Sequence, residues 1–137
     1  MTCSVSDVSP QQEQRQSNYD YGEELYHPFK TVNIMRRNYS VGRHLETWHT
    51  AQRNCEGEGG TLIQNRSRKW LEKAGAKLPG IEYMWVGKGE WLKNFIHNVP
   101  SFNRFFDCVC VKFDKNGGFV FRVMSCGADM SYVCQLN

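Results

Sequence analysis

Six cysteines in a chain of 137 residues limit the folds open to this sequence more than any other feature. An even number of cysteines in so short a chain indicates disulfide bonds, which persist in secreted and cell-surface proteins. Two Asn-x-Ser sequons, which begin at Asn38 and Asn65, agree with that compartment and make these asparagines the candidate glycosylation sites. No apolar run approaches the roughly 20 residues of a membrane-spanning helix. We therefore expect a secreted glycoprotein or a cell-surface ectodomain, with no transmembrane segment in this chain.

Charge divides the chain into two parts. Residues 1–28 carry a net charge of −4 and are rich in Gln and Ser, whereas residues 29–137 carry +7. The first part has too few aliphatic residues to bury a core, which predicts an acidic, largely flexible lead-in over 1–28. Its tyrosine-rich stretch 19–26 is interpreted as a first strand or a docked tail, with a sulfation site or a partner-binding strip as the alternative. Residues 29–137 are long enough for one domain with its own core.

Two segments of the domain have apolar residues at helical spacing. In the first, Trp48, Ala51 and Cys55 lie on one face of a helix, and the glycine-rich segment 56–60 ends it, since glycine adopts the left-handed conformation at little cost. The predicted helices run from Glu46 or Thr47 through Cys55, and from near Asn65 or Ser67 to Gly75.

Later in the chain the pattern changes to short strands. Strands are predicted at 83–86, 108–113, 119–123 and 131–134. The stretch 88–106 between the first two shows no clear periodicity, and irregular segments of this length within a domain are usually functional. Helices followed by strands predict an α+β fold with antiparallel sheets.

One hairpin can be placed in register from the residues alone. Asn116-Gly117-Gly118 is a turn signal between two apolar runs. If these three residues form the loop, Cys108 lies opposite Cys126, and Cys110 lies opposite Met124. Facing Cα atoms in an antiparallel pair are about 4.5–5.5 Å apart, which suits a disulfide bond. The hairpin therefore predicts a Cys108–Cys126 bridge.

Several short motifs occur in order between residues 39 and 134. They are Trp48-x-x-Ala51-x-x-x-Cys55, Gly59-Gly60-x-Leu62, Trp85-Val86-Gly87 with Trp91 after it, Asp107-Cys108-Val109, Ser125-Cys126 and Tyr132-Val133-Cys134. Together they resemble the C-type lectin-like domain family. The resemblance implies an α+β fold in which two helices flank antiparallel sheets and a long irregular loop, here 88–106, leaves the core.

The resemblance also implies two disulfide bonds. It pairs Cys55 with Cys134, and it pairs Cys108 with Cys126 in agreement with the hairpin. Cys3 and Cys110 fall outside these pairs. Either they form a further bond with each other, or Cys3 links two chains and Cys110 stays buried and free, as buried cysteines often do.

Calcium binding distinguishes the sugar-binding members of this family from the calcium-independent ones. Sugar-binding members hold Ca²⁺ through a Glu-Pro-Asn or Gln-Pro-Asp triplet in the long loop and a Trp-Asn-Asp before the Ser-Cys. Here the Trp-Asn-Asp positions hold Phe121-Arg122-Val123, and the loop proline stands in Val99-Pro100-Ser101. Calcium requires six to eight oxygen ligands. We therefore expect no calcium-dependent sugar binding, no metal site and no cofactor, and we interpret Glu90, Asp107 and Asp114 as solvated or structural acids.

Other chemistry has little support in this sequence. Cys108-x-Cys110 and the four histidines do not have the spacing of known zinc-ligand pairs, and a disulfide-bonded Cys108 cannot bind zinc. Segment 57–60 lacks the strand-turn-helix setting of a phosphate loop. No nucleophile elbow or oxyanion turn accompanies the Ser, His and Asp residues. We do not expect the chain to be an enzyme, and we expect no catalytic residues in it. Its four tryptophans, Trp48, Trp70, Trp85 and Trp91, are expected in the core rather than on a ligand platform.

Function is therefore expected at the surface of the long loop. Aromatic residues and Arg are typical of protein-binding hot spots, and calcium-independent members of the family, such as natural-killer-type receptors and venom lectin-like subunits, bind proteins through this face. We expect a protein receptor or ligand as partner, and a homo- or heterodimer is compatible with the resemblance. About half of the Phe105–Phe106 pair is expected to fill the core. The candidate ligand-binding residues are Lys88, Lys93, Phe95, His97, Phe102, Arg104, Phe105 and Arg122.

Two other functions stay open at this point. A basic domain behind an acidic leader faintly resembles eosinophil major basic protein, a lectin-fold protein with an acidic pro-piece, and predicts binding of anionic glycans or membranes. Calcium-independent sugar binding is the other. A nucleic-acid partner is not expected.

Overall fold

The computed structural model describes residues 28–136 of the chain. Residues 1–27 of the acidic lead-in, with its tyrosine-rich stretch and Cys3, lie outside the described residues. The elements, in chain order, are β1 (Phe29–Ile34), β2 (Arg37–Gly42), α2 (Trp48–Gly57), β3 (Gly60–Leu62), α3 (Arg68–Lys77), β4 (Tyr83–Trp85), α4 (Trp91–His97), β5 (Asp107–Phe113), β6 (Phe119–Ser125) and β7 (Val133–Leu136). Among these, no helix has the length and apolar character needed to cross a membrane.

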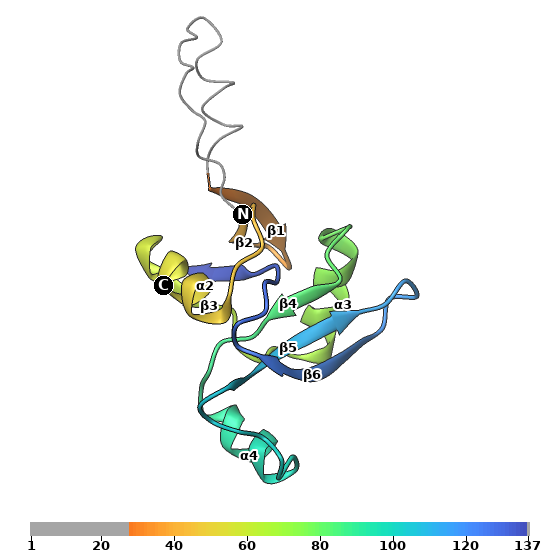
Figure 1. Cartoon of the computed structure of the whole chain (residues 1–137). Helices are drawn as coiled ribbons and strands as arrows, with labels where there is room; N and C mark the ends of the chain where they lie inside the picture. The colour runs from red at the N-terminus through yellow and green to blue at the C-terminus, as the bar shows by residue number, and fades with distance from the viewer. Residues whose placement is uncertain (1–27, 137) are drawn as a thin grey trace, which may run out of the picture.

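Two antiparallel sheets form the framework. One has the strand order β1-β2-β7-β3 and the other β4-β5-β6. Helix α2 lies beside the four-stranded sheet, α3 packs against β1 of the four-stranded sheet and β6 of the three-stranded sheet, and α4 stands at the end of the molecule opposite the β1–β2 hairpin (Figure 1). This arrangement confirms the α+β class predicted from the sequence.

Helix α2 begins as predicted. The Thr47 side chain accepts a hydrogen bond from the Thr50 N–H, and so satisfies a backbone donor that the first turn leaves free. The buried face carries Trp48, Ala51 and Cys55, the residues whose spacing predicted the helix. The helix ends at Gly57, within the glycine-rich segment expected to stop it.

Helix α3 runs two residues past its predicted end. Ser67 caps its start by accepting from the Trp70 N–H at 3.2 Å, as expected. Gly75 does not end the helix: a Cβ at that position would lie 3.1 Å from the Phe113 ring, so glycine here permits close packing of the helix on β5. Pro79 follows the cap residue and cannot continue the helix.

The register of the β5–β6 hairpin differs from the prediction by two positions. Phe113 pairs with Phe119, so the loop comprises residues 114–118 rather than three. The Asp114 carboxylate accepts from the N–H groups of Asn116 and Gly118, both at 2.9 Å, and this turn shortens the ladder. Cys108 consequently faces Met124, and Cys110 faces Arg122.

Both expected disulfide bonds are present. Cys55–Cys134 joins α2 to β7 with its Cα atoms 5.3 Å apart, and Cys108–Cys126 joins β5 to the end of β6 with its Cα atoms 5.0 Å apart. The Cys108 bond forms despite the register change because Cys126 lies just beyond β6, where its N–H donates to the Phe106 carbonyl and keeps it beside the start of β5. Cys110 is free and buried.

The core contains three of the four tryptophans. Trp48, Trp70 and Trp85 are buried, whereas Trp91 is partly buried. The Trp48 indole N–H donates to the Val86 carbonyl at 2.9 Å, and the Trp85 indole N–H donates to the Glu46 carbonyl at 2.8 Å. These bonds satisfy polar groups inside the core and hold the start of α2 against β4.

Candidate functional site

The long loop is partly helical. Segment 88–106 leaves the core after β4 and returns at β5, and it contains α4, a helix of seven residues with no buried residue. The sequence predicted no regular structure here. The sequence has no capping residue that marks the start of α4: Glu90 is at the N-cap, and its side chain makes no hydrogen bond to the helix. The Trp91 indole N–H, which donates to the Gly87 carbonyl at 3.1 Å, ties the helix to the core.

A tight turn ends the long loop. The Asn103 N–H donates to the Asp107 carboxylate at 2.9 Å, and the Phe105 N–H donates to the Asn103 side-chain oxygen at 2.9 Å. The Asp107 N–H donates back to the Asn103 carbonyl at 2.8 Å, and the Cys126 N–H donates to the Phe106 carbonyl at 2.9 Å. We call residues 103–106 the tip. Its backbone is fixed at both ends.

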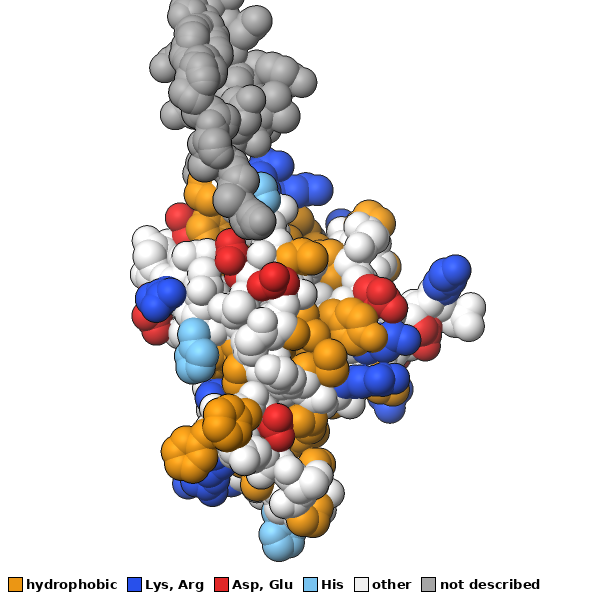
Figure 2. Space-filling model, in the orientation of Figure 1, with side chains coloured by type: hydrophobic (Ala, Val, Ile, Leu, Met, Phe, Trp, Pro, Cys, Tyr) orange, Lys and Arg blue, Asp and Glu red, His pale blue; other side chains and the backbone are white. Residues whose placement is uncertain are grey.

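The two phenylalanines of the tip point into solvent. Phe105 is 86% exposed and Phe106 is 68% exposed, so the expectation that about half of this pair would fill the core is wrong. The inward positions of the loop are taken instead by Phe95 and Phe102, whose ring centroids are 6.4 Å apart at nearly a right angle. In Figure 2, apolar side chains stand out at the lower end of the molecule, around α4 and the segment that leads to β5.

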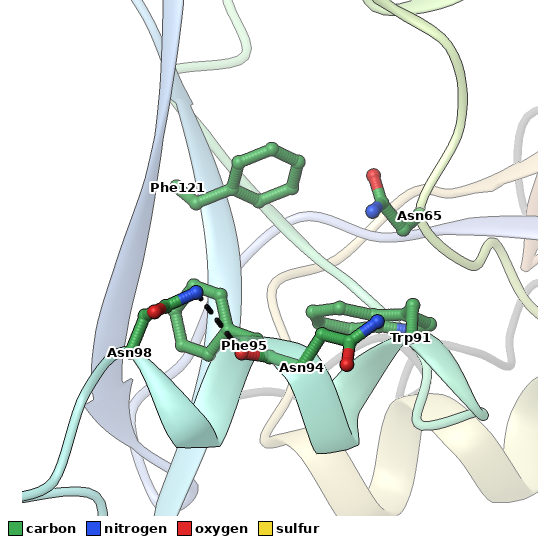
Figure 3. A pocket seen from close by; sticks show the side chains of 6 residues that line it. All are labelled: Asn65, Trp91, Asn94, Phe95, Asn98 and Phe121. Carbon is green, nitrogen blue, oxygen red and sulfur yellow. Dashed lines mark hydrogen bonds between the residues drawn. The ribbon is translucent and has the colours of Figure 1, made fainter.

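Beside α4 lies a hollow of about 250 Å³, which we call the aromatic cleft. Its lining combines three aromatic rings with three side-chain amides, and Figure 3 shows the amide of Asn65 facing the gap between the Phe121 and Trp91 rings. The lining residues are Asn65, Trp91, Asn94, Phe95, Asn98 and Phe121.

The rings of the cleft support one another. Trp91 contacts Phe95 edge-on at 5.8 Å and Phe121 at 6.5 Å between centroids. Of the amides, Asn98 donates to the Asn94 carbonyl at 3.2 Å, whereas the side chain of Asn65 makes no hydrogen bond within residues 28–136. Flat apolar rings edged by side-chain amides suit a small ligand with an apolar face and several hydroxyl or amide groups.

Of the cleft residues, the sequence singled out Phe95 as a binding candidate and Asn65 only as a glycosylation site. Residues 91, 94, 95 and 98 have the i, i+3, i+4, i+7 spacing of one helix face, which is the signal that could have revealed α4 and its share of the cleft. The contributions of Asn65 and Phe121 come from distant segments and depend on tertiary structure.

The charged candidates are dispersed over the surface. The Lys88 ammonium lies 4.7 Å from the centroid of a Trp48 ring, and Lys93 forms an exposed ion pair with Glu90 at 3.5 Å. The other exposed charged candidates are His97 on α4, Arg104 on the tip and Arg122 on β6. Among the eight candidates, the structure brings Phe95 and Phe102 into direct ring contact.

The acids near the loop have structural partners. Glu90 pairs with Lys93, Asp107 accepts from the Asn103 N–H, and Asp114 holds the β5–β6 turn. Within the described residues, no group of three or more His, Cys, Asp or Glu side chains could hold a metal ion. Cys108 is oxidised and cannot join Cys110 as a zinc ligand. Burial raises the pKa of the Cys110 thiol to about 11, against a smaller lowering by Arg122.

Comparison with known proteins gives a structural match. No family model and no curated protein matches the chain. Among solved structures, EMS16, an antagonist of the collagen receptor integrin α2β1 (GPIa/IIa), matches with a TM-score of 0.55 and 20% sequence identity. The match covers 76% of this chain and 94% of EMS16. It confirms the fold that the sequence motifs implied.

Proposed function

We propose that this chain, which has the C-type lectin-like fold, is a non-enzymatic extracellular recognition module that binds a protein partner through its tip without calcium. The observation that carries the proposal is the pair of exposed phenylalanines, Phe105 and Phe106, on a turn with a fixed backbone.

A partner that covers the exposed aromatic rings at the loop end would gain free energy from their burial. Burying apolar surface contributes roughly 25 cal/mol per Å², and aromatic side chains and Arg dominate binding hot spots. Arg104 adjoins the two rings and adds a donor for an acidic or carbonyl group of the partner. Because the turn is already ordered, binding would cost little conformational entropy.

The acids of the loop support binding without calcium. Glu90, Asp107 and Asp114 are engaged with Lys93, with Asn103 and with the β5–β6 turn, respectively. Recruiting them as ligands for a cation would break the contacts that order the tip and the hairpin.

The structural match supports a protein as the partner class. EMS16 is an antagonist of an integrin receptor, so a chain of this fold can act by contact with another protein. Two disulfide bonds in a small domain support an extracellular setting.

The test measures binding to a panel of purified receptor ectodomains with EDTA present. A Phe105→Ser/Phe106→Ser variant is compared with a Leu45→Ser/Val120→Ser variant, which also replaces two exposed apolar side chains, 57% and 51% exposed. The tip variant is expected to raise the Kd of a binding ectodomain at least roughly tenfold. The control variant is expected to leave the Kd unchanged.

Equal loss of binding in both variants would contradict a role for the tip, and loss of binding on adding EDTA to the unchanged chain would contradict calcium independence. Deglycosylating the ectodomain separates recognition of protein from recognition of its sugars. Binding that disappears with the sugars would favour a lectin.

An anionic polymer is a second candidate partner. Lys69, Lys73 and Lys77 are exposed on α3 at i, i+4 and i+8, which aligns three cations about 6 Å apart along one face. Heparin retention over a salt series tests this, because polyanion binding weakens with ionic strength. A Lys69→Gln/Lys73→Gln/Lys77→Gln variant should elute earlier than a Lys30→Gln/Lys93→Gln/Lys115→Gln variant of equal charge. Co-elution of the two would rule out a specific site on α3.

A further inference from the structure

The aromatic cleft includes a residue that secretory cells can modify. We propose that Asn65 carries an N-linked glycan and that the first N-acetylglucosamine of this glycan occupies the cleft between Phe121 and Trp91. The proposal rests on the extracellular setting of the proposed function, and it assigns the cleft an occupant that belongs to the protein itself.

The three residues of the sequon point to different neighbours. Ser67 caps α3, and the Arg66 guanidinium lies over the Trp70 ring at 5.5 Å and reaches Gln135 at 3.4 Å. Asn65 is exposed and lines the cleft (Figure 3). A sugar on its amide nitrogen would start at the wall of the cleft rather than in open solvent.

The chain on either side of Asn65 is fixed. On one side, the Gln64 side chain donates to the Lys88 carbonyl at 3.0 Å, and the Ile63 carbonyl accepts from the Gly87 N–H at 2.7 Å. On the other side, Ser67 is held by the α3 cap. An attached sugar would therefore have a restricted orientation, which lowers the entropy cost of docking it.

The covalent step uses a co-substrate of the secretory pathway. The Asn65 amide nitrogen attacks the anomeric carbon of an oligosaccharide linked to a lipid diphosphate. A nitrogen–carbon bond forms, and the carbon–oxygen bond to the diphosphate breaks with its electron pair leaving on the lipid diphosphate. The proton lost by the amide nitrogen passes to a base of the transferase and from there to solvent. The step precedes folding, so the Ser67 hydroxyl is not yet engaged in the α3 cap.

One N-acetylglucosamine ring suits the size and chemistry of the cleft. The volume of about 250 Å³ lies just below the roughly 300–1,000 Å³ of sites for larger ligands. The C–H face of the ring and its acetamide methyl are apolar and can lie against Phe121 and Trp91. Its hydroxyl and amide groups can reach the side chains of Asn94 and Asn98 at the edge of the cleft.

The second sequon provides a matched control. Asn38 lies in β2 and is exposed, and its side-chain oxygen accepts from Asn33 at 3.0 Å across the β1–β2 hairpin. The cleft residues do not include it. A glycan on Asn38 would therefore extend from the hairpin without entering the cleft.

The experiment uses the full chain secreted from cells that make oligomannose glycans, trimmed to one N-acetylglucosamine per site by an endoglycosidase. Intact mass and peptide mapping report occupancy. An Asn65→Gln variant is expected to melt about 4 °C below the trimmed wild type, and Asn38→Gln is expected to leave the Tm unchanged. In a Trp91→Ala background, Asn65→Gln should lower the Tm by less, because the sugar has lost one of its two ring contacts.

A second measurement does not depend on the stability of variants. In the trimmed wild type, ring currents of the cleft should shift one acetamide methyl proton resonance upfield, and Asn65→Gln should abolish that resonance. An unmodified Asn65 overturns the proposal. So does a modified Asn65 without the upfield resonance, or equal Tm changes in the two asparagine variants. Receptor binding measured on the same samples tests the tip separately. If the samples bind no receptor, the mass, Tm and resonance measurements still decide whether the glycan occupies the cleft.

Discussion

Cys108 faces Met124 across the β5–β6 ladder, and its sulfur is bonded to Cys126, which lies just past the end of β6. The Cys126 N–H donates to the Phe106 carbonyl at 2.9 Å, so the bond closes the chain directly beneath the tip. The disulfide thus secures the base of the proposed binding turn as well as the sheet.

Removing this bond should loosen the tip more than the core. The two cysteines are 18 residues apart, and their bond restricts the unfolded chain by closing that loop. A Cys108→Ala/Cys126→Ala variant lacks this restriction and should lose about 3 kcal/mol of unfolding free energy. Removing Cys55–Cys134, with a separation of 79 residues, should cost about 4–5 kcal/mol. Urea unfolding measures both, and hydrogen exchange at residue 126 should accelerate in the first variant alone. Unchanged exchange there would show that the turn holds without the bond.

A substitution at Gly60 tests how closely β3 approaches β7. A Cβ at Gly60 would overlap the backbone carbonyl of Gln135, and the strand cannot move away without breaking the β3–β7 ladder. Gly60→Ala should cost about 3 kcal/mol. Gly57→Ala, at the end of α2 with open space around it, should gain about 0.5–1 kcal/mol. Thermal melts of the two variants should shift in opposite directions. A shift in the same direction would contradict the close approach.

The β1–β2 turn holds two unfavourable backbone conformations. Met35 and Arg36 have φ of 52° and 71° in the two-residue loop between Ile34 and Arg37, a geometry that favours Asn-Gly. A Met35→Asn/Arg36→Gly variant should gain about 1–2 kcal/mol. Chemical denaturation measures the gain. A loss of stability would mean that the two side chains make contacts that outweigh the strain.

Cys110 should make the fold sensitive to alkaline pH. Its pKa of about 11 in the folded chain exceeds the ordinary 9.0, so the unfolded state loses its proton first. Unfolding free energy should fall between pH 9 and 11, by up to about 2–3 kcal/mol. Burial also raises the pKa of Tyr132, which acts in the same direction. Denaturant titrations at several pH values in this range give the unfolding free energy. This free energy should fall less steeply with pH in Cys110→Ala than in the unchanged chain.

The same burial should protect the thiol from reagents. In a Cys3→Ser background, iodoacetamide at neutral pH should leave Cys110 unlabelled in the folded chain and label it in guanidinium chloride, as measured by peptide mass. Rapid labelling of the folded chain would show that β5 opens locally.

Local signals determined how far the sequence could predict this fold. Thr47 and Ser67 cap α2 and α3, and their hydroxyls are recognisable in the sequence. Helix α4 has no such cap. The β5–β6 register was missed because the Asp114 carboxylate extends the turn, an effect that the Asn-Gly-Gly signal does not reveal.

The candidate site was harder to predict, because it depends on tertiary structure. Phe105 and Phe106 look like core residues in sequence, and their exposure follows from a hydrogen-bonded turn between Asn103 and Asp107. The cleft brings together three segments around Asn65, α4 and Phe121. No sequence pattern within a single segment predicts that these three segments come together, although the helical spacing in α4 predicts the residues that α4 contributes.

The position of β7 sets the order of events during synthesis. In the strand order β1-β2-β7-β3, β7 is the strand that connects its two neighbours, and it is the last strand along the chain. The ribosome must release residues 133–136 before β2 and β3 can share a sheet or Cys55 can find its partner. Until then, the hydrophobic faces of α2 and the β1–β2 hairpin lack their cover. A nascent chain stalled before residue 133 should therefore depend on chaperones and carry a reduced Cys55.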